Sequence, residues 1–115
     1  LRQLPPEIKG LANLLKLNLS HNQLTFVPPE IAQLSHLQHL SLSDNQLTSL
    51  PGEIGQLANL LSLELRQNQL TQLPQQIKGL NQLQQLFLDH NQITQLPPFI
   101  TQLEKLHTLN LSGNS

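Results

Sequence analysis

The sequence predicts an α/β solenoid in which five copies of one 23-residue unit stack into a single domain over residues 1–115. Three observations support this expectation: an asparagine column, two leucine columns and a proline column all keep the same step of 23 residues. A fixed period of this length is typical of repeat proteins, in which each unit contacts only its neighbours. The asparagines are Asn22, Asn45, Asn68, Asn91 and Asn114.

The two leucine columns predict a short strand in each copy. Leu40 and Leu42 are separated by one residue, and a period of two places both side chains on one face of a strand. One such strand cannot bury its leucines alone, so we expect the copies to stack into a parallel sheet over one aliphatic core. The columns are Leu17, Leu40, Leu63, Leu86 and Leu109, and Leu19, Leu42, Leu65, Leu88 and Leu111.

After each strand, the repeat predicts a turn and then a short helical return. An asparagine amide both donates and accepts, so Asn22, Asn45, Asn68 and Asn91 are expected to form a buried ladder with neighbouring backbone groups. The Pro-x-x-Ile-x-x-Leu spacing that follows fits a short helical or 3₁₀ segment on the outer side, since proline ends the extended stretch. The proline and isoleucine columns are Pro5, Pro28, Pro51, Pro74 and Pro97, and Ile8, Ile31, Ile54, Ile77 and Ile100.

One copy reads Leu37-x-x-Leu40-x-Leu42-x-x-Asn45-x-Leu47-x-x-Leu50-Pro51-x-x-Ile54-x-x-Leu57. This pattern resembles the leucine-rich repeat family, in the 23-residue variety with a Leu-Pro-x-x-Ile segment. Repeats of that variety are similar to those of Scribble-like scaffold proteins, plant Ras-group proteins and bacterial Roco-type proteins. The resemblance covers the whole chain. It implies a right-handed solenoid with parallel strands on the concave face, turns or 3₁₀ segments on the outer face, and protein binding in signalling or scaffolding.

Composition and charge narrow the function classes. The formal net charge is −1 and the basic residues do not cluster, so the chain lacks the basic stripe that nucleic acid or an anionic membrane surface requires. No apolar run approaches the roughly 20 residues of a membrane span. The sequence has no cysteine and no visible signal peptide, which favours a reducing, cytoplasmic location. We therefore expect neither nucleic acid nor a membrane as a partner.

Residues that vary at outward-facing strand positions are the candidates for recognition. Phe87 lies between two inward leucines, so alternation predicts that it faces outward as an exposed aromatic binding anchor. Arg66 and Asp89 belong to adjacent strands about 4.8 Å apart and are close enough to pair. The alternative is a tolerated surface aromatic beside a weak surface ion pair. The expected partner-binding residues of the concave face are Phe87, Glu64, Arg66, Asp89, His39, Ser41 and Gln85.

The remaining polar residues do not predict a metal site or a catalytic site. His21 and His90 share a column but lie three repeats apart, roughly 14 Å at sheet spacing, which is too far to share one metal ion. Ser20, Ser43 and Asp44, like His21, are expected to be solvated turn residues rather than parts of a catalytic triad. No glycine-rich phosphate loop is present. We expect no cofactor, no metal and no enzymatic activity.

Two aromatic residues and the two ends of the chain give further expectations. Phe26 and Phe99 fall outside the leucine columns and are expected to be largely exposed, with local packing favoured over a second binding site.

Neither end shows a polar cap, so the chain is expected to be a stretch of a longer protein whose caps or further repeats lie outside it. A designed array and end-to-end self-association through the uncapped ends are the alternatives.

The sequence thus favours a recognition module that binds a protein or peptide on its concave sheet, centred on residues 62–66 and 85–89. The alternative is a regulatory repeat segment of a larger signalling enzyme such as a Roco-type GTPase. The resemblance allows that alternative, but no GTPase motif lies in these residues. A glycan ligand is a further option, although few aromatic side chains are available for stacking against sugars.

Overall fold

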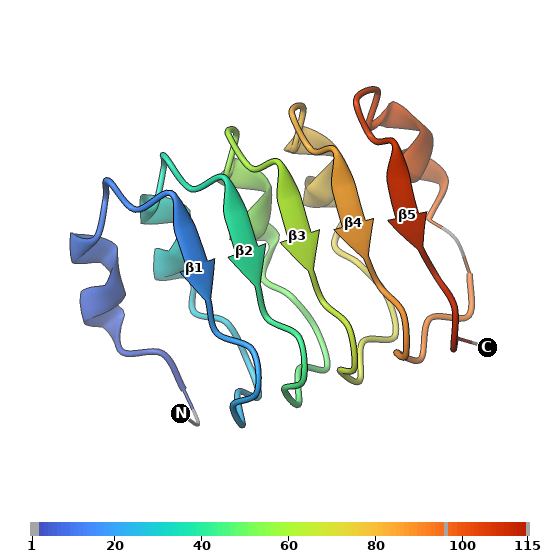
Figure 1. Cartoon of the computed structure of the whole chain (residues 1–115), viewed down its shortest axis with the longest axis horizontal. Coiled ribbons are helices and arrows are strands. Elements are labelled where there is room, and N and C mark those ends of the chain that lie inside the picture. Colours follow the sequence, from blue (N-terminus) through green and yellow to red (C-terminus); the bar gives the residue numbers. More distant parts are fainter. Residues whose placement is uncertain (1–2, 96, 115) are drawn as a thin grey trace.

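Within residues 3–95 and 97–114, which the computed structural model describes, each repeat contributes one short strand to a five-stranded parallel sheet (Figure 1). The strands pair in sequence order with like positions opposite each other, so that Leu63 lies between Leu40 and Leu86. Each strand residue therefore lies opposite the residue that occupies the same position in the next repeat. The strands are β1 (Lys16–Asn18), β2 (His39–Ser41), β3 (Ser62–Glu64), β4 (Gln85–Phe87) and β5 (Thr108–Asn110).

A 3₁₀ segment follows each member of the proline column. Pro51 has φ −70° and ψ 148°, and the chain turns into a 3₁₀ segment directly after this extended residue. The segment ends where the N–H of Leu57 donates to the carbonyl of Ile54. These features confirm the 3₁₀ return that the proline and isoleucine spacing predicts. The segments are η1 (Pro6–Gly10), η2 (Pro29–Gln33), η3 (Gly52–Gln56), η4 (Gln75–Gly79) and η5 (Pro98–Gln102).

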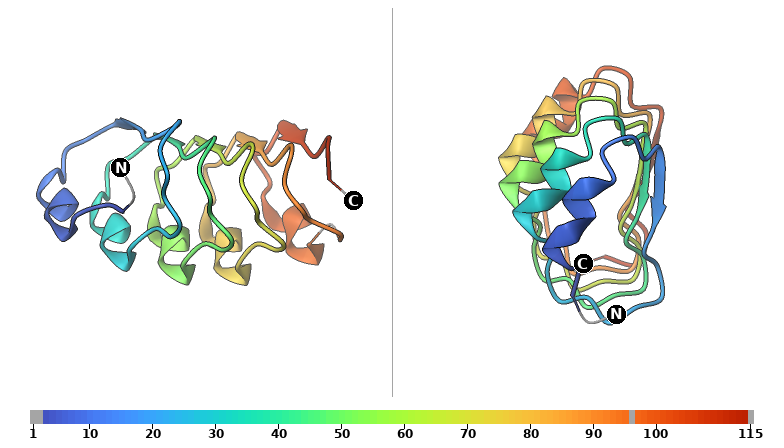
Figure 2. Two further views of the ribbon diagram at one scale, coloured as in Figure 1. Left: turned by 90° about the horizontal axis from the view of Figure 1, so that it is seen from below. Right: turned by 90° about the vertical axis from the view of Figure 1, so that its left-hand side faces the viewer.

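The strands and the 3₁₀ segments form two layers on opposite sides of the coil (Figure 2). The 3₁₀ segments fan out more widely than the strands, so the sheet lies on the inner side of the curve (Figure 2, left). Aliphatic side chains fill the space between the layers, and Leu63, Leu65 and Ile54 are fully buried there. The α/β solenoid with an aliphatic core is confirmed.

The asparagine column forms the predicted ladder. The amide nitrogen of Asn45 donates to the carbonyl of Leu19 in the preceding repeat at 3.0 Å and to that of Leu42 at 2.9 Å. Its amide oxygen accepts from the N–H of Leu24 at 3.0 Å. Asn68 and Asn91 repeat these bonds one and two copies further along. Each asparagine therefore joins the turn of its own repeat to the backbone of the repeat before it.

Two glycines allow η3 and η4 to approach closely. A Cβ on Gly55 would lie 2.8 Å from the carbonyl carbon of Gln76 and would overlap its carbonyl oxygen. A Cβ on Gly79 would lie 3.0 Å from the carbonyl oxygen of Gly55. The other repeats carry lysine, alanine or threonine at the position of Gly55, so this close approach is particular to the η3–η4 pair.

Replacing Gly55 with alanine is expected to lower the free energy of unfolding by about 1–3 kcal/mol, because a methyl group there forces two backbones apart. Urea denaturation followed by circular dichroism measures the change. Gly10→Ala is the matched control, since a Cβ on Gly10 meets no heavy atom within 4 Å. That variant is expected to match the wild type or to exceed it by a few tenths of a kcal/mol. Equal destabilisation by both variants would contradict the packing argument.

Candidate functional site

The seven candidate residues come together on the concave side of the solenoid, on the face of the sheet turned away from the core. Ser41, Glu64 and Phe87 are neighbours across β2, β3 and β4, and His39 and Gln85 flank the intervening Ser62 in the same way. Arg66 and Asp89 follow β3 and β4 and line the same hollow as Glu64. The leucines that alternate with them face the core, so the repeat itself sorts the variable side chains onto one face.

Arg66 connects two of the other candidates. Its guanidinium carbon lies 4.3 Å from the centre of the Phe87 ring, within the range of a cation–π contact. Its Nε lies 3.4 Å from Oδ1 of Asp89, so the predicted ion pair is present. Phe87 faces outward but is half-buried, and the expectation of an exposed aromatic is therefore wrong. The reason is that the long side chain of the neighbouring repeat covers the ring.

Asp89 is buried although it carries a charge. The residue is 9% exposed, and its Oδ1 makes no hydrogen bond to any described residue. Nε of Arg66 is also buried and makes no hydrogen bond to any described residue, although it lies 3.4 Å from Oδ1 of Asp89. Arg66 is thus the cation that compensates this carboxylate, and loss of its charge would leave a buried charge unpaired.

A polar hollow of about 450 Å³ opens beside this cluster. We call it the sheet groove. It crosses the ends of β1 to β4, where each strand passes into its turn. Polar side chains from four successive repeats therefore face one continuous space. The groove is lined by Asn18, Ser20, His21, Ser41, Ser43, Asp44, Glu64, Arg66, Gln67, Asp89 and His90.

Each strand is followed by a residue in the left-handed backbone region, with φ between 54° and 75°, and the first four of these five residues form the rim of the groove. In those four, the N–H donates to the next repeat, as when the N–H of Asp44 donates to the carbonyl of Arg66 at 2.9 Å. Sequence reasoning missed the column, although its one glycine, Gly113, is the residue that tolerates positive φ best. The members are His21, Asp44, Gln67, His90 and Gly113.

Side chains of the rim contact one another across repeats. Nδ1 of His21 lies 3.0 Å from Oδ2 of Asp44. The Gln67 amide, with its nitrogen turned toward Asp44, donates to the same carboxylate. Asp44 is therefore held between an imidazole and an amide of the two flanking repeats.

Two further expectations need correction. Ser43 is buried rather than solvated, because its hydroxyl accepts from the N–H of Arg66 at 3.1 Å in the repeat that covers it. Phe99 is half-buried against the core rather than largely exposed, and it lines a small hollow with Leu73 and Pro97. Phe26 is 48% exposed, as expected. Contacts with neighbouring repeats explain both corrections, since they bury positions that look exposed within one copy.

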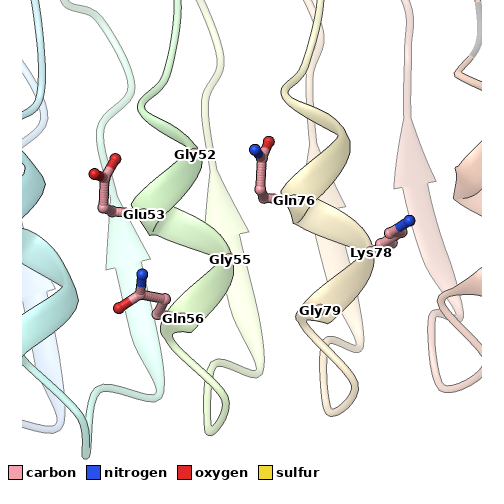
Figure 3. Close-up of a pocket in the computed structure, with 7 residues that line it drawn as sticks. All are labelled: Gly52, Glu53, Gly55, Gln56, Gln76, Lys78 and Gly79. Carbon is pink, nitrogen blue, oxygen red and sulfur yellow. The ribbon is translucent and has the colours of Figure 1, made fainter.

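A second hollow, of about 530 Å³, lies on the outer face between η3 and η4 (Figure 3). Gln76 points from η4 toward η3, whereas Lys78 points away from that segment (Figure 3). Three of its seven lining residues are glycines, namely Gly52, Gly55 and Gly79. The Gln76 and Lys78 side chains point in different directions, so the polar groups of this hollow do not converge. The sheet groove is the better candidate site.

Two of the histidines contact groups of a neighbouring repeat. His21 pairs with Asp44, and Nδ1 of His36 lies 3.1 Å from the carbonyl oxygen of Ala12. Among the described residues, no three side chains of histidine, aspartate or glutamate are placed to hold one metal ion. In the same part of the chain, no helix has the length and apolar character needed to cross a membrane.

Comparison with known families agrees with this geometry. A leucine-rich repeat model matches residues 5–47 and 35–93, and a model of two leucine-rich repeat copies matches residues 81–115. The chain belongs to the leucine-rich repeat family. No curated protein sequence matches it significantly.

Several solved leucine-rich repeat structures are similar to the chain. One is a leucine-rich repeat protein of Leptospira interrogans, 46% identical with a TM-score of 0.95, covering 98% of this chain and 29% of that one. Another is a plant peptide hormone receptor in complex with RGF2, 31% identical with a TM-score of 0.88, covering 97% and 19%. A third is a chain of the Drosophila Toll–Spatzle complex, 35% identical with a TM-score of 0.90, covering 99% and 17%. This chain spans less than a third of each.

The leucine-rich repeat separates residues that hold the fold from residues that are free to vary. The position of Phe87 is asparagine, serine, glutamate and asparagine in the other copies, and that of Arg66 is serine or aspartate. Neither side chain belongs to the buried core or takes part in the hydrogen bonds of the asparagine ladder, although the Arg66 carbonyl accepts from Asn68. The cluster of Arg66, Phe87 and Asp89 is therefore not required by the repeat.

Proposed function

We propose that this chain is a recognition module that binds a protein or peptide on the concave face formed by β2 to β4. The cluster of Arg66, Phe87 and Asp89 carries this proposal. These side chains come from two adjacent repeats and are fixed against each other in the middle of the sheet. Arginine and aromatic residues are the types that most often dominate binding energy at protein interfaces.

The side chains of the cluster are held in place by one another, and part of their surface is exposed to solvent. The side chain of Arg66 is 41% exposed, while that of Asp89 is 12% exposed and holds it from below. The sheet beneath is anchored by the leucine core and the asparagine ladder. A surface that is already ordered loses less side-chain and loop entropy on binding, which supports recognition by this face.

The similar structures favour a polypeptide ligand. The plant receptor is in complex with RGF2, and the other structure is the complex of Toll with Spatzle. In each, one chain resembles nearly the whole of this chain over less than a fifth of its own length. The sheet groove presents polar side chains without an enclosed cleft, which suits an extended peptide better than a catalysed reaction.

Selection from a displayed library of short linear peptides tests the proposal. Peptides that bind the wild type are expected to lose at least about tenfold in affinity for the double variant Phe87→Ala/Arg66→Glu, because the aromatic anchor is lost and the Arg66–Asp89 pair that fixes the cluster is broken. The matched control is Phe26→Ala/Lys78→Glu, which makes the same kinds of change away from the sheet face. Circular dichroism and melting curves must first show that all three proteins are folded.

The control variant is expected to bind the selected peptides as the wild type does. Peptides that bind Phe87→Ala/Arg66→Glu with unchanged affinity would place recognition elsewhere, and the outer hollow between η3 and η4 would be examined next.

A further inference from the structure

The sheet groove carries more negative than positive charge. Its lining holds the carboxylates of Asp44, Glu64 and Asp89 and one permanent cation, Arg66, which leaves a formal charge of −2 with histidine neutral. The whole chain has a formal charge of only −1. The groove therefore concentrates negative charge on a chain that is otherwise nearly neutral.

The one cation in the groove lining is already engaged. Nε of Arg66 faces Oδ1 of Asp89 at 3.4 Å, and the guanidinium lies over the Phe87 ring. Turning Arg66 toward a ligand carboxylate would leave the buried Asp89 without its counter-ion, which is costly. Arg66 is therefore a poor receptor for an acidic ligand.

The excess negative charge of the groove belongs to the other two carboxylates, those of Asp44 and Glu64. Asp44 contacts the imidazole of His21 and the amide of Gln67, neither of which is a permanent cation. Among the described residues, Glu64 has neither an ion pair nor a side-chain hydrogen bond, although it is half-buried beside Phe87 in the sheet register. Lys16 lies on the same face two strands away and lines a smaller hollow together with Glu64, but the described residues show no ion pair between the two.

We propose that the partner segment is basic, an extended peptide that places lysine or arginine side chains against Glu64 and Asp44. This inference rests on the proposed function and adds the chemistry of the partner to it. An arginine would fit best, because its planar guanidinium can donate two parallel hydrogen bonds to the Glu64 carboxylate. A half-buried carboxylate that lacks a partner gains most from such a pairing.

The dimensions of the groove agree with a short extended segment. It crosses four strands, and three steps of about 4.8 Å give a length of about 14 Å. An extended chain covers that length with about four residues. A segment of that length has room for a basic side chain toward each carboxylate.

The test uses the peptides selected on the wild-type chain. We expect them to be enriched in lysine and arginine, and we expect a synthetic peptide with citrulline in place of its arginine to bind at least about tenfold more weakly. Citrulline keeps the shape of arginine and removes its charge. Affinity for the arginine peptide is also expected to fall as salt rises.

A pair of charge-matched variants locates the effect. Glu64→Gln/Asp44→Asn is expected to abolish the preference for arginine over citrulline, and asparagine tolerates the left-handed backbone at position 44. Glu53→Gln/Glu104→Gln removes the same number of charges outside the groove and is expected to keep the preference.

The outcomes separate the two proposals. Peptides that require Phe87 and Arg66 but bind equally well with citrulline would overturn the basic partner and leave the recognition face standing. Acidic peptides that no longer bind the Phe87→Ala/Arg66→Glu variant would also overturn the basic partner and leave the recognition face standing. A selection that yields no peptide dependent on the groove would overturn both.

Discussion

Alanine in place of Asn68 is expected to lower the free energy of unfolding by about 3–5 kcal/mol. The Asn68 amide oxygen accepts from the N–H of Leu47 at 3.0 Å, and its nitrogen donates to the carbonyl of Leu42 at 3.0 Å and to that of Leu65 at 3.2 Å. The residue is 7% exposed, so these backbone groups have little access to water. Each buried group left without a partner costs about 1–3 kcal/mol. Equilibrium urea unfolding followed by circular dichroism measures the loss.

Two further variants show whether the ladder is the cause. Asn81→Ala removes an exposed asparagine amide and is expected to change stability by no more than about 0.5 kcal/mol. Asn68→Asp keeps an acceptor for Leu47 but replaces the donor with a charge that faces the Leu42 carbonyl, so it is expected to be nearly as destabilising as alanine. A loss for Asn68→Ala no larger than that for Asn81→Ala would show that the ladder contributes little to stability.

The repeated part of the fold was predictable because every structural requirement occurs five times in the sequence. A leucine that faces the core, a proline that precedes a 3₁₀ segment and an asparagine that joins two turns each recur at the same step. A single leucine such as Leu63 would fit a core helix as well as a strand, and a single proline such as Pro51 would fit any turn. Five copies with the same spacing exclude those other interpretations and predict a stack of similar units.

The parts that sequence reasoning missed depend on contacts between unlike residues of adjacent repeats. Ser43 is buried because the repeat carrying Arg66 covers it, and Phe87 is half-covered because Arg66 is long enough to reach over its ring. Neither contact recurs elsewhere among the described residues, so no column of the repeat reveals it. The left-handed rim is a property of the backbone, and its members share a conformation rather than a residue type.

The candidate site contains features that the repeat predicts and features that only the structure reveals. Alternation was enough to place His39, Ser41, Glu64, Gln85 and Phe87 on one face, and the step of one repeat was enough to pair Arg66 with Asp89. The surplus charge at Glu64 and Asp44 required the structure, because it depends on which carboxylates already have a cation nearby. Ligand binding by this set of residues stays a prediction.

Alanine in place of Leu63 is expected to lower the free energy of unfolding by about 2–5 kcal/mol. Leu63 is 0% exposed and lies between Leu40 and Leu86 in the sheet register. The cavity left by the lost methyl groups would therefore be walled by leucines on both sides. It cannot close unless β2 and β4 shift, and the sheet and the asparagine ladder oppose that shift.

Leu109→Ala provides the matched control at the same position of the repeat. Leu109 lies on β5, pairs with Leu86 in the sheet, and is 37% exposed. Its loss is expected to cost less than half as much as the loss of Leu63, since much of its surface already meets water. Equal costs for the two variants would mean that Leu109 is covered in solution. A second copy stacked on β5 would cover it in that way, and light scattering at increasing protein concentration would then show the mass rising above that of a single chain.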